Sequence, residues 1–123
     1  MNIVELLQQA NKFAASGDLK QAISCATQVL EQEVNNLAAL QILVMANFQL
    51  GRLEVAKQYV DTAIIHFPNH PLFHNLTGVI ACQQGDYEEG IMQCKKAVTL
   101  QPNYSEAIYN LALAYQKTGD LVQ

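Results

Sequence analysis

Four glycines stand 34 residues apart in this chain of 123 residues: Gly17, Gly51, Gly85 and Gly119. This fixed period constrains the fold more than any single side chain, because it marks a stack of similar units that bury their apolar faces against one another. Other residues keep the same register. Five positions after the first three glycines stand small residues, Ala22, Ala56 and Gly90, and Pro68 and Pro102 are also 34 residues apart.

Each class of residue has a physical role in a helical hairpin. A glycine can adopt the positive φ at which one helix ends, a small residue lets two helices approach closely, and a proline stops the second helix. Apolar residues recur at helical spacing on both sides of each glycine. The pattern predicts an all-α solenoid of antiparallel helix pairs with seven helices, over residues 3–15, 19–32, 37–50, 53–66, 71–84, 87–100 and 105–118.

Composition narrows the class of protein. Half of the residues are apolar and 15% are charged, so the chain is expected to fold. A net charge of -4, with seven Lys and Arg and no basic run, argues against nucleic-acid binding. No stretch approaches the roughly 18 apolar residues of a membrane span, and the start lacks a secretory signal, which favours the cytoplasm. Cys25, Cys82 and Cys94 form no CxxC pair and are predicted to be reduced thiols.

Three histidines form the most suggestive metal pattern in the chain. His66, His70 and His74 follow the spacing H-x3-H-x3-H, which would stack three imidazoles on one face of a continuous helix. Pro68 and Pro71 interrupt that helix, so the histidines are expected at a helix end, in a loop and in a new helix. We therefore predict turn and surface histidines and no metal site.

Catalytic patterns are also absent from the sequence. Asp86, Glu88 and Glu89 fall at a turn and a helix start, where the helix dipole favours negative charge. Ser24-Cys25 has no histidine placed near it by the repeat register, and the glycines form no phosphate-binding loop. We predict no catalytic residue, no cofactor and no enzymatic activity within these residues.

The segment Ile108–Tyr115, followed by Gly119, resembles the first helix and turn of a tetratricopeptide repeat. With Gly17 as the fifteenth position, the resemblance predicts one array with units 3–36, 37–70, 71–104 and a partial unit 105–123, and it implies a right-handed superhelix. The chain departs from the family pattern at Gln9, at Val34 and at the fourth position, where the family favours Trp and unit three has His74.

The fourth unit has its first helix but not its second. Either this helix caps the array, or the chain is a piece of a longer protein. A natural cap presents a polar outer face. Ile108, Leu111, Ala112 and Tyr115 instead form an apolar face, so we expect a piece of a longer protein, or self-association through this helix.

The resemblance implies a concave groove lined by the first helix of each unit. The groove residues that it implies are Leu7, Asn11, Gln41, Ile42, Met45, Phe48, Leu72, Asn75, Leu76, Val79, Tyr109, Asn110 and Leu113. One subgroup of the family grips a chaperone's terminal carboxylate with Lys, Asn and Arg. Of the corresponding positions here only Asn11 fits, so that carboxylate clamp is absent.

The implied groove is apolar with amides at its edges, and an apolar patch of this kind is typical of an interaction surface. We expect a protein-interaction scaffold or adaptor that binds an amphipathic helix or an apolar peptide segment. A second copy of the chain is another possible occupant. The first alternative is an accessory domain of a larger group-transfer enzyme such as a glycosyltransferase. The second is a small apolar ligand in the groove.

Overall fold

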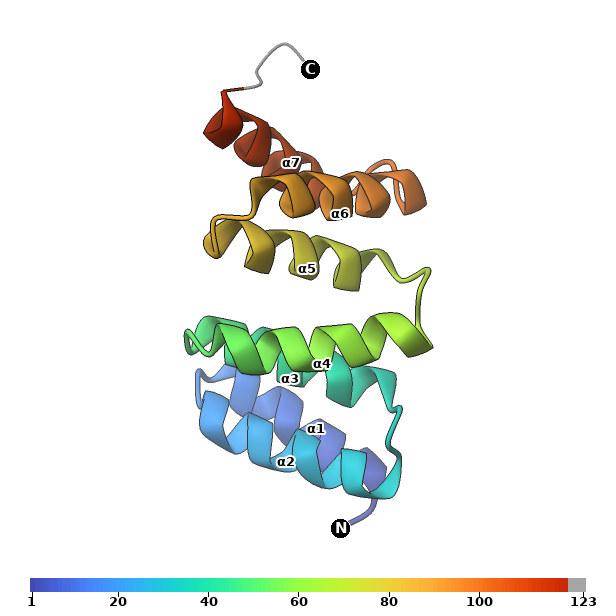
Figure 1. Cartoon of the computed structure of the whole chain (residues 1–123). Helices are drawn as coiled ribbons and strands as arrows, with labels where there is room; N and C mark the ends of the chain where they lie inside the picture. The colour runs from blue at the N-terminus through green and yellow to red at the C-terminus, as the bar shows by residue number, and fades with distance from the viewer. Residues whose placement is uncertain (120–123) are drawn as a thin grey trace. The chain divides into compact units, whose positions relative to one another are not determined.

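The computed structural model describes residues 1–119, and helices are the regular secondary structure of that part of the chain (Figure 1). The helices are α1 (Ile3–Ala15), α2 (Leu19–Gln32), α3 (Leu37–Gln49), α4 (Leu53–His66), α5 (Pro71–Gln83), α6 (Tyr87–Leu100) and α7 (Ser105–Thr118). The prediction of seven helices is confirmed over these residues. Residues 120–123 of the predicted partial unit lie outside them.

Two predicted helix ends are one residue too long. Leu50 and Gln84 are cap residues rather than helical ones, so α3 ends at Gln49 and α5 at Gln83. The reason is the glycine that follows each cap. Gly51 and Gly85 have φ of 78° and 86°, a conformation that no helical residue adopts and that glycine reaches without a Cβ clash.

Side-chain caps explain where four of the helices begin. The side chains of Asn2, Asp18, Asn36 and Asp86 each accept a hydrogen bond from the backbone N–H three residues later, at 2.8 to 3.3 Å. Such a cap satisfies a donor that has no partner inside the helix. Pro71 opens α5, where its missing N–H is not needed.

The chain divides into two compact units: unit 1 is Met1–His66 and unit 2 is Phe67–Gln123. In unit 1 α1 packs on α2, α2 on α3 and α3 on α4, and α1 also contacts α3. In unit 2 α5 packs on α6, α6 on α7, and α5 also contacts α7. Within each unit, the first helix of one repeat therefore lies beside the first helix of the next.

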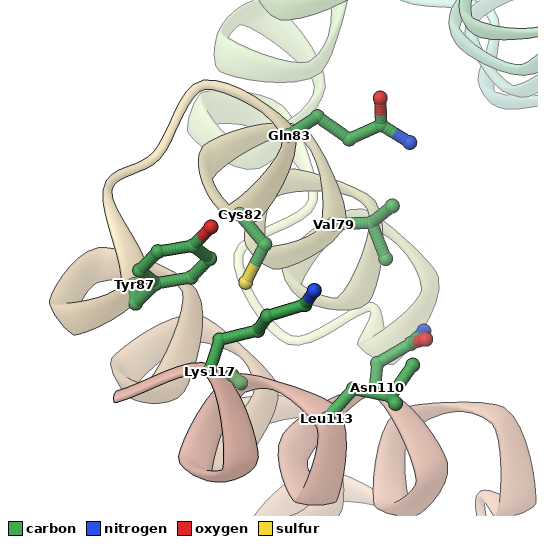
Figure 2. A pocket seen from close by; sticks show the side chains of 8 residues that line it. Val79, Cys82, Gln83, Tyr87, Asn110, Leu113 and Lys117 are labelled. Atoms are coloured by element: carbon green, nitrogen blue, oxygen red, sulfur yellow. The ribbon is translucent and has the colours of Figure 1, made fainter. Parts of the chain in front are cut away.

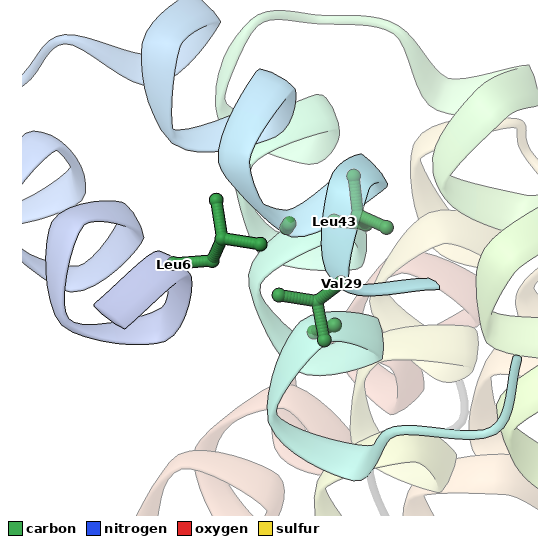
Figure 3. Close-up of a cluster of buried hydrophobic side chains, with 5 residues drawn as sticks. Leu6, Val29 and Leu43 are labelled. Atoms are coloured by element: carbon green, nitrogen blue, oxygen red, sulfur yellow. The ribbon is translucent and has the colours of Figure 1, made fainter. Parts of the chain in front are cut away.

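A cluster of aliphatic side chains lies in the core of unit 1. Leu6, Val29 and Leu43 converge from α1, α2 and α3 (Figure 3). Ala26 and Ala39 complete the cluster, and all five side chains are at most 2% exposed. Full burial of a Leu or Val side chain contributes about 1.5–3 kcal/mol, so this cluster is a main source of stability for unit 1.

The core of unit 2 contains a close helix crossing. A Cβ built at Gly78 on α5 would lie 2.6 Å from the Cys94 Sγ and 3.0 Å from the Gly90 carbonyl oxygen on α6. A Cβ at Gly90 would likewise meet the Cys82 thiol and the Gly78 carbonyl. The small residues of the repeat therefore serve the predicted purpose here, because the helices meet where neither has a side chain.

Candidate functional site

Unit 1 has a pocket between α1 and α3. Its volume is about 260 Å³ and the start of α2 closes one side. It is lined by Asn11, Ala14, Leu19, Gln41, Ile42, Met45, Ala46 and Gln49. Four of these belong to the predicted groove set: Asn11, Gln41, Ile42 and Met45. The pocket has no charged side chain in its lining.

Unit 2 has a pocket between α5 and α7 (Figure 2). Its volume is about 250 Å³ and the start of α6 closes one side. It is lined by Val79, Cys82, Gln83, Tyr87, Asn110, Leu113, Ala114 and Lys117. Val79, Asn110 and Leu113 belong to the predicted groove set.

The two pockets occupy the same place in the repeat. Seven of the eight lining residues of each pocket stand 68 residues, or two repeat lengths, from a lining residue of the other pocket. The pairs are Asn11 and Val79, Ala14 and Cys82, Leu19 and Tyr87, Ile42 and Asn110, Met45 and Leu113, Ala46 and Ala114, and Gln49 and Lys117. The repeat therefore forms the same kind of pocket in two separate units.

The chemistry of the two pockets differs although their position is shared. Met45 and Leu113 keep the central position apolar, whereas Gln49 in unit 1 is replaced by Lys117 in unit 2. Figure 2 shows the Lys117 side chain extending from α7 toward α5. Burial and then the charge of Asp86 raise the pKa of the Cys82 thiol, so this lining side chain is uncharged at neutral pH.

Hydrogen bonds hold one pocket residue in place. The Asn110 Nδ2 donates to the Asn75 Oδ1 at 3.1 Å, and the Asn75 Nδ2 donates to the Tyr104 Oη at 3.4 Å. Asn75 is 3% exposed, so it acts as a buried link between α5 and α7 rather than as an open groove residue. Burial raises the pKa of Tyr104, which keeps this hydroxyl protonated at neutral pH.

The other predicted groove residues lie outside these two linings. Leu7 packs against the unit 1 core, as Ile42 does from its place in the pocket. Phe48, Leu72 and Leu76 are partly buried, and Tyr109 is exposed. The resemblance therefore marks the right helices but does not separate packing residues from pocket residues.

Nine lining residues are absent from the predicted groove set: Ala14, Leu19, Ala46, Gln49, Cys82, Gln83, Tyr87, Ala114 and Lys117. Leu19 and Tyr87 open the second helix of their repeats, and the groove positions were taken from first helices alone. The signal that finds them is the repeat itself. Both follow a Gly-Asp pair and both are large and apolar.

The histidines are separated as predicted, but one prediction about them is wrong. His66 ends α4, His70 precedes α5 and His74 lies within α5. His74 is 6% exposed and hydrogen-bonded on both ring nitrogens, so it is a core residue and not a surface one. The fourth position faces the core in the first three repeats, where Leu6 and Leu40 are buried as well. Residues 1–119 contain no cluster of His, Cys, Asp and Glu that fits a metal ion.

Two further sequence predictions can be compared with the described residues. All three cysteines are free thiols, with Cys25 and Cys94 buried and Cys82 half-buried. Within residues 1–119, no helix combines the length and the apolar character that crossing a membrane requires.

Two curated proteins resemble the chain over most of its length. The anaphase-promoting complex subunit cut9 of Schizosaccharomyces pombe is 27% identical over 115 residues, which cover 88% of this chain and 17% of that protein. The transcription factor tau 131 kDa subunit of Saccharomyces cerevisiae is 24% identical over 98% of this chain and 12% of that protein. The chain thus spans less than a fifth of the length of these relatives.

Solved structures share the fold. MamA superposes with a TM-score of 0.90 at 21% identity, over 98% of this chain and 70% of that one. The first TPR of Spaghetti (RPAP3) bound to an HSP90 peptide gives 0.90 at 21% identity, over 95% and 93%. The O-GlcNAc transferase of Thermobaculum terrenum gives 0.86 at 26% identity, over 92% and 22%.

Two family models match complementary parts of the chain. A tetratricopeptide repeat model matches residues 13–80, which is more than half of the chain, and a TPR repeat model matches residues 78–119. These matches agree with the 34-residue register, the helix bounds and the glycine turns. The chain belongs to the tetratricopeptide repeat family.

Proposed function

We propose that this chain is a protein-interaction scaffold whose two equivalent pockets hold apolar side chains of a partner protein. The observation that carries the proposal is the recurrence of one pocket, with the same repeat positions and nearly the same volume, in both units. A pocket formed only by irregular packing has no reason to recur two repeats later.

The size of the pockets favours a side chain as the occupant. Pockets for small molecules usually have about 300–1,000 Å³, whereas these have about 250 and 260 Å³. A Leu, Ile, Met or Phe side chain fits such a volume. The central residues, Met45 and Leu113, are exposed and apolar, and a Met side chain adapts to varied partners. The pocket volumes therefore favour a protein segment over a small apolar ligand as the occupant.

An amphipathic helix or an apolar extended segment is the proposed form of the partner. Both present apolar side chains at regular spacing, which suits pockets that recur with the repeat. Two similar proteins are named as subunits of larger assemblies, and one similar structure contains a bound peptide. These names support a scaffold role. The proposed cytoplasmic location and the proposed absence of catalysis rest on the sequence.

A peptide selection followed by pocket variants tests this function. Displayed libraries of helical and extended peptides would be selected on the wild-type chain, and the affinity of the selected peptides would be measured by fluorescence anisotropy. Met45→Glu with Leu113→Glu should weaken binding at least tenfold, because a carboxylate in each pocket opposes apolar anchoring. Ile65→Glu, on an exposed position of α4 that lines neither pocket, is the matched control.

Two outcomes contradict the proposal. One is unchanged affinity in the double pocket variant while circular dichroism shows full helix content. The other is equal loss in the Ile65→Glu control. Sedimentation at high concentration, with and without peptide, shows separately whether a second copy of the chain competes for the same pockets.

A second candidate function is an accessory domain of a group-transfer enzyme. It is favoured by the likeness to the O-GlcNAc transferase, where the chain matches 22% of the solved structure. In that case the partner segment is a substrate protein and the pockets select it. A reading frame that continues into a catalytic domain supports this candidate, and one that continues only into further repeats opposes it.

A further inference from the structure

His74 has an oxygen acceptor at each ring nitrogen. Its Nε2 lies 2.6 Å from the Pro68 carbonyl oxygen, and its Nδ1 lies 2.9 Å from the Gln93 Oε1. A carbonyl oxygen only accepts hydrogen bonds, so the Nε2 must carry a proton. Whether the Nδ1 also carries one depends on which way the Gln93 amide points, because its oxygen and nitrogen exchange places on a flip.

Glu89 determines the orientation of that amide. The Gln93 Nε2 donates to the Glu89 Oε1 at 2.9 Å. If the amide were flipped, the Gln93 oxygen would face the ionised Glu89 carboxylate, and two acceptors would lie within hydrogen-bond distance of each other. The amide oxygen therefore faces His74, and the Nδ1 must carry a proton as well.

We propose that His74 is held as an imidazolium in the folded protein and that its second proton locks the core of unit 2. The positive ring is bonded at both nitrogens, and the Gln93 amide connects it to the negative Glu89 carboxylate. Gln93 is 9% exposed and Glu89 is partly buried, so water competes weakly with this chain of bonds. The loop at Pro68, α5 and α6 are thereby joined at one residue.

Ionisable groups also lie on α6, next to α7 and in the loop before α5. On α6, the buried Cys94 thiol has a pKa raised to about 11 by burial and then by Cys82, so it is neutral at pH 7. Next to α7, Tyr104 bonds to Asn75 and stays neutral, and Glu106 lies exposed in the first turn. In the loop, His70 contacts the Phe73 ring at 5.0 Å between centroids.

A lock of this kind makes stability depend on pH in a defined direction. Loss of the second ring proton would remove the Nδ1–H that donates to the Gln93 Oε1. Stability should therefore fall as the pH rises and the ring becomes neutral.

The imidazole nitrogens can be observed directly. Two-bond ¹H–¹⁵N spectra of the full chain at pH 7 distinguish a ring with two protonated nitrogens from either neutral tautomer, and His74→Leu assigns the signal. We expect His74 to give the imidazolium pattern. A pattern with one bare nitrogen overturns the proposal, whatever the stability of the variant.

Variants then test the link to stability. The urea midpoint of the wild type should fall from pH 5.5 to pH 8. Glu89→Gln should reduce this fall. A neutral side chain at position 89 lets the Gln93 amide flip, and the Gln93 Nε2 can then donate to the bare Nδ1 of a neutral His74. His74→Leu, which introduces the residue of the first two repeats, should abolish it. His66→Gln, on an exposed helix end, should retain it in full.

If His74→Leu does not fold, Glu89→Gln and the imidazole spectrum still decide. An equal fall with pH in the wild type and in Glu89→Gln contradicts the lock, and so does a wild-type midpoint that does not change between pH 5.5 and pH 8.

Discussion

In unit 1 the fourth position of the first repeat is Leu6, surrounded by aliphatic side chains, whereas in unit 2 the position 68 residues later is His74, bonded to Gln93 and Pro68. The helices that carry these residues begin and end at equivalent positions. Unit 1 is held mainly by apolar burial, and its buried Asn47 bonds within its own helix to the Leu43 carbonyl oxygen. Unit 2 adds buried polar bonds between elements and a glycine crossing. The repeat thus specifies where a side chain points but leaves its chemistry open.

The largest loss of stability is expected when the fourth-position residue of unit 1 is replaced by that of unit 2. Leu6→His should destabilise unit 1 by about 3 kcal/mol, because it removes apolar burial and leaves ring nitrogens without partners. The position equivalent to Gln93 is Cys25, which cannot replace the amide. Urea unfolding followed by circular dichroism measures the loss. Leu6→Met is the control, at about 1 kcal/mol, and equal losses would show that the two cores do not differ as described.

The glycine crossing gives the next effect. Gly78→Ala should cost about 1–2 kcal/mol despite the better helix propensity of Ala, because its Cβ meets the Cys94 thiol and the Gly90 carbonyl. In a Cys94→Ala background most of that cost should disappear. The equivalent residue of unit 1 is Ala10, and Ala10→Gly should cost about 1 kcal/mol. Additive losses in the Gly78 and Cys94 double variant would show that the thiol does not limit the crossing.

High pH should weaken unit 2 through Cys94. Its folded pKa of about 11 lies above the ordinary value of 9.0, so the fold favours the neutral thiol. Its stability contribution is complete below pH 9 and is lost as the pH rises toward 11. Amide exchange of α5 and α6 should accelerate over this range in the wild type. The change should be smaller in Cys94→Ala, where Cys82 and Tyr104 are the other groups of unit 2 with raised pKa values. An equal change in this variant rules out Cys94 as the source.

Surface contacts should give the smallest effects. Lys57 and Asp61 form an exposed pair at 3.2 Å on α4, and Asp61→Asn should cost at most about 0.5 kcal/mol. Lys95 lies 5.5 Å from the Tyr115 ring centroid and connects α6 to α7, so Lys95→Gln should cost about 0.5–1 kcal/mol. Thermal unfolding at low and high salt measures both. A larger loss for Asp61→Asn would reverse the order expected here.

Sequence periodicity was sufficient to predict the helices and their turns. Gly17 and its three counterparts recur because glycine adopts the positive φ of these turns without a steric penalty. Buried small residues recur because larger side chains would prevent the close approach of the helices. Each of these features is local and recurs with the 34-residue period, so a single sequence shows it several times and makes it predictable.

The site was predicted only in part. The repeat register gives the position of a residue on its helix, but whether that residue lines a pocket depends on the side chains of the neighbouring helices. Leu7 and Met45 both lie on groove helices, yet Leu7 packs on the core and Met45 lines a pocket. Tyr87 was missed because it belongs to a second helix. The burial of His74 was not predicted, because its partner Gln93 is distant in sequence and does not recur with the repeat. The same holds for Glu89, which accepts a hydrogen bond from Gln93.

The most direct test of the central claim is a methyl NMR titration of the full chain with a selected peptide. The account predicts that the methyl signals of Met45 and Leu113 shift or broaden together, at the same peptide concentration, while that of Ile65 stays unchanged. Changes confined to Ile65 and other methyls outside the two pockets, with Met45 and Leu113 unaffected at saturating peptide, would contradict it.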